Sequence, residues 1–259
     1  MNATARGLLS GSLLIWLFTT AAVAGPPFAT DDPEPTDYHH FEVYLYSEGT
    51  HAEGDTSGTL PGFEVNYGVA PDLQLSAAVP LSFDKGAQHG TLYDYGATEL
   101  GIKYRFIHED DDGWRPQVSF YPSVEVPIGD SDRPNGIGGG HTRYFLPVWM
   151  QKSMGPWTTF GGGGYWINPG KGDKDYWFAG WALQRQITHN LSLGVELFHQ
   201  TKDSMSGRAS TGTNLGGLYD LNDRWHLMGS IGTGVQNHRS TNELTYYVAI
   251  EWTPSMDGH

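Results

Sequence analysis

Leu100-Gly101-Ile102-Lys103-Tyr104-Arg105-Phe106 is the stretch of this chain that says most about its fold. Successive side chains of a β-strand point to opposite faces. Every second residue from Leu100 to Phe106 is apolar or aromatic, while the other face carries Lys103 and Arg105, with Glu99 directly before it. This is the pattern of a membrane barrel, in which apolar side chains meet lipid and polar side chains face the lumen.

The same alternation recurs along the chain and predicts about twelve strands, an even number as single-chain bacterial barrels require. We therefore expect an all-β fold, a transmembrane antiparallel up-and-down β-barrel. The expected strands begin near His40 and lie at about 40–46, 63–69, 73–82, 97–107, 115–128, 143–153, 156–167, 176–187, 190–200, 211–221, 224–236 and 243–252.

The connections between these strands alternate in length, with short turns at Ala70–Asp72, Ser153–Pro156, Thr188–Asn190 and Asn222–Asp223. Outer-membrane barrels have short periplasmic turns and longer external loops. The intermediate turn at His108–Trp114 belongs to the short set by its order. The expected external loops are 50–59, 84–96, 129–142, 168–175, 201–210 and 237–242.

The N-terminus has the organisation of a secretory signal peptide, with Arg6, an apolar run over Leu13–Phe18 and small residues ending at Ala24. The apolar run is too short to span a bilayer as a helix. We therefore expect a signal peptide over 1–24, a periplasmic N-terminal extension over 25–39 and the barrel over 40–259.

A secreted β-sandwich or lipocalin-like barrel would show a similar alternation, but its outward face would be polar. Five tryptophans are instead expected near strand ends, where membrane barrels collect aromatic residues. They are Trp157, Trp177, Trp181, Trp225 and Trp252.

Composition limits the possible partners and chemistry. The chain has no cysteine, which excludes disulfides and thiolate sites, and its net charge of −14 argues against binding nucleic acid. We expect no cofactor, no bound metal and no enzymatic activity. The expected partners are outer-membrane lipids, lipopolysaccharide and a small-molecule solute, and the expected location is the bacterial outer membrane.

The strand phases predict which charged side chains face the lumen. Charged groups inside a protein must be paired or hydrated, so we expect Lys103 and Arg105 to face some of the lumenal glutamates, with Arg143 as a further cation. Such a set could form a plug of ion pairs or line a narrow pore. The predicted pore-lining residues are Glu42, Glu64, Glu99, Lys103, Arg105, Glu125, Glu196 and Glu251.

Four segments give the chain a resemblance to a known family: Asp31–Tyr46, the Phe63–Leu75 hairpin, Thr98–Phe106 and Val124–Gly129. The chain resembles the outer-membrane β-barrel family labelled as the meta-pathway of phenol degradation, or simply as transporters. The resemblance implies an outer-membrane channel or transporter, linked by its label to small aromatic compounds, and carries over no catalytic residues. We therefore expect a channel for passive passage of small solutes, including aromatic or hydrophobic compounds.

Two local motifs suggest other functions. The Asp130–Gly136 loop has oxygen-bearing residues but lacks the bidentate Glu of a calcium loop. His238 and Ser240 form a His-x-Ser pair like that of an outer-membrane phospholipase, in which a histidine activates a serine. The alternatives to a channel are therefore an outer-membrane lipid hydrolase using this pair and a plugged structural barrel without transport.

Overall fold

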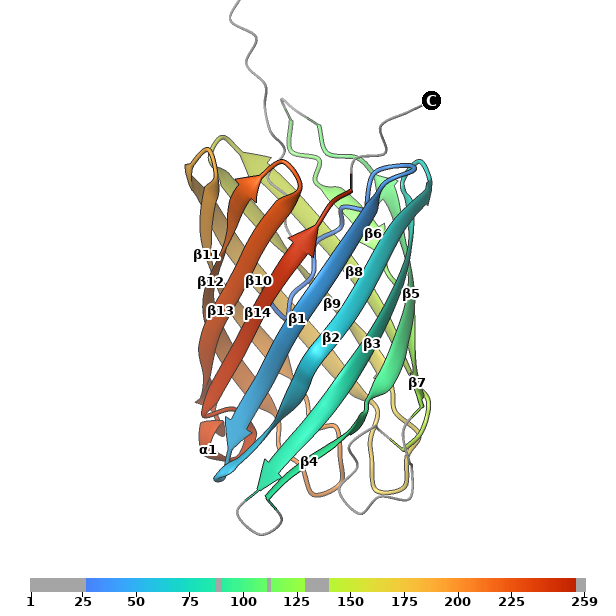
Figure 1. Ribbon diagram of the computed structural model, residues 1–259, viewed down its shortest axis with the longest axis vertical. Coiled ribbons are helices and arrows are strands. Elements are labelled where there is room, and N and C mark those ends of the chain that lie inside the picture. Colours follow the sequence, from blue (N-terminus) through green and yellow to red (C-terminus); the bar gives the residue numbers. More distant parts are fainter. Residues whose placement is uncertain (1–26, 87–89, 111–112, 129–139, 255–259) are drawn as a thin grey trace, which may run out of the picture.

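The computed structural model is a closed antiparallel β-barrel, and it describes residues 27–86, 90–110, 113–128 and 140–254. Its strands follow the chain around the barrel, and β1 pairs with β14 to close it (Figure 1). The strands are β1 Phe41–Ala52, β2 Asp55–Ala70, β3 Leu73–Gly86, β4 Gly90–Tyr95, β5 Ala97–Ile107, β6 Gln117–Phe120, β7 Ser123–Pro127, β8 Arg143–Met154, β9 Trp157–Ile167, β10 Tyr176–Thr188, β11 Leu191–Gln200, β12 Ser210–Asn222, β13 Trp225–Gln236 and β14 Leu244–Trp252.

Two of the barrel strands are interrupted, so the 14 named strands form 12 barrel strands. β4 and β5 both pair with β3 and are separated by Gly96. β6 and β7 both lie between β5 and β8 and are separated at Tyr121 and Pro122, where proline removes a backbone donor. The predicted fold class and strand number are confirmed.

The outer face of the barrel is apolar, as the Leu100–Phe106 stretch predicts. Leu100, Ile102, Tyr104 and Phe106 are 48–51% exposed on β5, whereas Lys103 is 5% exposed on the inner face. Of the five tryptophans, Trp181 lies in the middle of β10 rather than near a strand end, and its Nε1 donates to Thr159 Oγ1 at 2.8 Å. The other four lie at or next to strand ends.

The start of β1, the end of β14 and the short turns lie at one end of the barrel, the terminal end, and the other described connections lie at the loop end (Figure 1). Two expected external loops are wrong in extent. β1 and β2 continue to a two-residue turn at Glu53 and Gly54, which have φ values of 55° and 89°, and β3 and β4 continue to Gly86 and Gly90. The ends of β1 and β2 lack apolar alternation, and in β4 it is limited to Tyr93 and Tyr95, although the backbone ladder continues through all of them.

Residues 237–242 form a compact connection around the short helix α1 His238–Thr241, rather than an open loop. Within the described ranges, no helix has the length and hydropathy needed to cross a bilayer. The expected signal peptide over 1–24 and the Asp130–Gly136 loop lie outside the described residues.

Candidate functional site: the lumen and its N-terminal strap

Residues 27–40, here called the strap, lie inside the barrel rather than outside it as a periplasmic extension. The strap enters the lumen from the terminal end and returns to the start of β1 (Figure 1). Thr30, Asp32 and Thr36 are all buried. The expected periplasmic location for 25–39 is therefore wrong for the described part, because the polar groups of the strap find partners on the inner wall.

The first half of the strap is bound to the wall formed by β9–β13. Ser230 Oγ donates to the Pro27 carbonyl at 2.6 Å, and the Phe28 ring lies 6.2 Å from that of Phe160. The backbone N–H and the hydroxyl of Thr30 both donate to Glu196 Oε1 at 2.6 Å. Glu196 therefore anchors the strap and is sheltered from the lumen by it.

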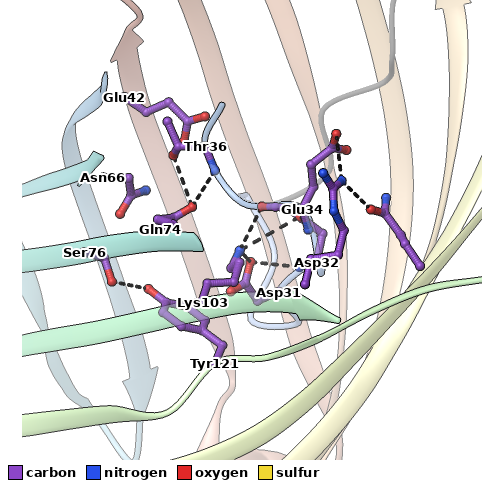
Figure 2. Close-up of polar contacts among 12 residues, drawn as sticks. Asp31, Asp32, Glu34, Thr36, Glu42, Asn66, Gln74, Ser76, Lys103 and Tyr121 are labelled. Carbon is purple, nitrogen blue, oxygen red and sulfur yellow. Dashed lines mark hydrogen bonds and ion pairs between the residues drawn. The ribbon is translucent and has the colours of Figure 1, made fainter. Parts of the chain in front are cut away.

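From Asp31 onward the strap contacts the opposite wall. Lys103 Nζ on β5 lies 3.2 Å from Asp31 Oδ1 and 4.0 Å from Asp32 Oδ1 (Figure 2). The N–H and the hydroxyl of Thr36 donate to Gln74 Oε1 on β3 at 2.8 Å and 3.1 Å. Contacts on both walls hold the strap across the lumen.

Arg105 fixes the strap to the barrel at the terminal end. Its guanidinium lies 2.8 Å from Asp72 in the β2–β3 turn and 3.7 Å from Glu34 of the strap. The expected glutamate partners for Lys103 and Arg105 on the barrel wall are therefore wrong, because aspartates of the strap and of a turn come closer. The expected cation Arg143 does pair with Glu125.

Burial changes the acidity of the strap carboxyls. It raises the pKa of Asp32 well above its usual range, while the positive charge of Lys103 opposes that shift. Burial also raises the pKa of Glu34, with Arg105 opposing it. The two cations on β5 therefore help to keep these carboxyls ionised, although Asp32 is buried and Glu34 is only 32% exposed.

A cavity of about 700 Å³ remains beside the strap, on the side of the barrel formed by β1, β2, β3 and β5. Of the predicted pore-lining residues, Glu42, Glu64, Glu99 and Lys103 line this cavity. The other four lie elsewhere on the inner face: Arg105 and Glu196 hold the strap, Glu125 pairs with Arg143, and Glu251 Oε1 lies 3.1 Å from the Tyr44 hydroxyl.

The His238 and Ser240 pair lies in α1 at the loop end, with His238 exposed and Ser240 half-buried. Ser240 Oγ donates to the carbonyl of Asn237 at 3.1 Å, not to His238. Asn237 Nδ2 donates to the Ala209 carbonyl, so its amide does not orient a histidine. The serine hydroxyl is therefore bonded within its own turn, and this arrangement does not favour the hydrolase.

Sequence reasoning missed the strap, although the chain carries signals for it. Prolines at 27, 33 and 35 prevent a regular strand, and the acidic residues between them complement Lys103 and Arg105. Gly180 on β10 also faces the strap, and a Cβ there would overlap Thr30 Oγ1. A glycine on the inner wall opposite an acidic, proline-rich segment is the pattern that could have revealed the contact.

Replacing Gly180 with alanine should loosen the strap, because the added methyl group would overlap Thr30 Oγ1. Overpacking of this kind costs about 1–3 kcal/mol, so we expect Asp-N protease to cleave before Asp31 roughly tenfold faster, as followed by intact-protein mass spectrometry. The control is Gly229→Ala on β13, where the nearest atom to an added Cβ lies at 3.5 Å. Equal cleavage rates for the two variants would contradict this prediction.

The comparisons with known proteins agree with this architecture. Residues 93–247 match the model of the family described as "Putative MetA-pathway of phenol degradation". The chain belongs to this family. The match covers more than half of the chain, from the end of β4 into β14, and confirms the expected resemblance. Comparison with curated protein sequences finds no match.

Several solved barrel structures resemble this chain in fold. An outer membrane channel from Pseudomonas putida F1 has a TM-score of 0.72 at 13% identity, covering 86% of this chain and 98% of that one. The NanC porin has a TM-score of 0.56 at 10% identity, covering 83% and 100%. The KdgM porin in complex with disordered oligogalacturonate has a TM-score of 0.54 at 11% identity, covering 82% and 99%. At these identities the likeness shows the fold, which is that of outer-membrane channels and porins.

Proposed function

We propose that this protein is a passive channel of the bacterial outer membrane for small solutes, with a lumen that favours cations. The observation that carries the proposal is the cavity beside the strap, whose wall bears Glu42, Glu64 and Glu99. Among the described residues, none of these three has a Lys or Arg ion-pair partner. Fixed charges on a pore wall attract ions of opposite sign and exclude those of like sign.

The location and the partners of the barrel follow from its surface. The apolar band on the outer face requires lipid around it, and outer-membrane lipids and lipopolysaccharide would supply this environment. Aromatic rings of Tyr44, Tyr46 and Tyr121 line the cavity, which supports aromatic compounds within the solute range. The carboxylates without cation partners lie in the lumen, and α1 holds no catalytic arrangement. We therefore propose a channel rather than an enzyme.

Reconstitution in planar bilayers tests the channel directly. We expect discrete current steps and, across a KCl gradient, a reversal potential that shows K⁺ preferred over Cl⁻. The Glu64→Gln/Glu99→Gln double variant removes two wall charges and should lower this preference by about twofold or more. The control is Glu109→Gln in the β5–β6 turn, a carboxylate that pairs with Lys152 at the terminal end and does not line the cavity.

A folded, reconstituted protein that carries no current would contradict the channel and favour a plugged structural barrel. A channel that prefers Cl⁻, or one whose preference is unchanged in the double variant, would leave a channel but contradict the assigned role of the wall carboxylates.

A further inference from the structure

The cavity beside the strap carries more acidic groups than its own cations can pair. Its lining includes one lysine, Lys103, whose ammonium is already held by Asp31 and Asp32. A carboxylate shielded from water needs a positive partner or strong donors. The acidic residues of the lining are Asp31, Asp32, Glu34, Asp37, Glu42, Glu48, Glu64 and Glu99.

An amide oxygen without a donor lies on the same wall. Asn66 on β2 is only 6% exposed, and its Nδ2 donates to Glu64 Oε1 at 3.1 Å. Its Oδ1 has no hydrogen-bond partner in the described part of the chain. Buried polar atoms are nearly always paired, so an orphan acceptor beside carboxylates marks a place for a donor. Figure 2 shows Asn66 on the cavity side of β2, near Glu42 and Gln74.

The strand register places these acceptors in two neighbouring rows. Glu42 on β1 lies opposite Asn66, and Tyr44 lies opposite Glu64. The Tyr44 hydroxyl lies 3.1 Å from both Glu42 and Glu251, and it can donate to only one of them at a time. The β1–β2 wall is therefore rich in acceptors and poor in donors.

The opposite side of the cavity shows what this set of groups can bind. The Lys103 ammonium is held there by strap carboxylates and the Glu34 carbonyl, and it lies 4.9 Å from the centre of the Tyr121 ring. Carboxylate, amide-type oxygen and aromatic face are the three elements that recognise an ammonium group. The β1–β2 wall repeats these elements with Glu64, Asn66 and Tyr44 but has no ammonium of its own.

We infer that this cavity is a binding site for an organic ammonium ion, held by Glu64, the Asn66 carbonyl oxygen and Glu42. A metal ion is a poorer fit because, within the described ranges, no three acidic or histidine side chains come close enough to hold one. The volume of about 700 Å³ is that of a small-molecule site. The inference rests on the proposed channel function and names a solute class for it, small amines and aromatic amines above all.

Calorimetric titration of the full barrel in detergent tests the site without relying on conductance. Three probes of one size separate charge from shape: benzylammonium, neutral benzyl alcohol and anionic benzoate. We expect benzylammonium to bind at least about tenfold more tightly than benzyl alcohol, and benzoate to show no binding. Equal affinity for benzylammonium and benzyl alcohol would overturn the inference.

Variants at the two central groups locate the site. Glu64→Gln and Asn66→Leu should each weaken benzylammonium binding by about tenfold, whereas Asn66→Asp keeps an oxygen acceptor and should bind at least as well as the unmodified chain. If Asn66→Asp still binds benzylammonium, the weaker binding of Asn66→Leu comes from the lost acceptor and not from a misfolded barrel. The matched control is Gln184→Leu, a buried amide on β10 that does not line the cavity.

Unchanged affinity in both Glu64→Gln and Asn66→Leu would overturn the assigned site. A barrel that conducts but does not bind benzylammonium would contradict this inference alone. A barrel that binds it without conducting would instead contradict the channel.

Discussion

Deleting residues 28–36 should raise the single-channel conductance by about twofold or more, because the strap crosses the lumen between the β9–β13 wall and β5. The deletion joins Pro27 to Asp37 and leaves every strand intact. It also removes Asp31, Asp32 and Glu34 and leaves Lys103 and Arg105 without these partners. The preference for cations should therefore fall as the conductance rises.

Planar-bilayer recording measures both the conductance and the preference for cations. The control replaces 28–36 with a Gly/Ser linker of equal length, which cannot form the contacts with Glu196, Lys103 and Gln74. If the strap narrows the pore through those contacts, the linker variant should resemble the deletion. Conductance equal to that of the unmodified chain in both variants would place the strap outside the ion path.

Replacing Lys103 with methionine should detach the middle of the strap. Lys103 is buried and provides the only cation within 4 Å of Asp31 and Asp32 among the described residues. Removing one partner of a buried ion pair costs about 3–5 kcal/mol, because the other charge stays behind unpaired. We expect Asp-N cleavage before Asp37 to accelerate by about 100-fold, together with noisier open-channel current.

Replacing all three charged groups with neutral ones separates lost pairing from general damage. Lys103→Met combined with Asp31→Asn and Asp32→Asn has no unpaired charge at this point and should recover most of the protection against cleavage. The matched control is Lys152→Met, because Lys152 pairs with Glu109 and Asp110 at the terminal end, away from the strap. A triple variant cleaved as fast as Lys103→Met alone would show that charge is not what holds the strap.

Part of this structure could be predicted from the sequence. The barrel could be predicted because each strand faces two solvents, lipid and water, and this leaves an alternation every second residue along Leu100–Phe106 and its repeats. The inward phase of Glu42, Glu64, Glu99 and Lys103 follows from the same alternation. The strand ends near Glu53 and Gly86 escaped prediction because beyond the apolar band neither face is required to be apolar.

The sequence by itself determined the barrel, its strand number and the acidic character of its inner face, since these depend on a local period of two residues. Only the tertiary structure decided that the strap lies in the lumen, that Lys103 pairs with Asp31 rather than with a wall glutamate, and that a cavity remains beside Glu64 and Asn66. Those contacts join residues far apart along the chain, such as Thr30 and Glu196. Their partners are chosen by distance inside the closed barrel, which a local pattern does not record.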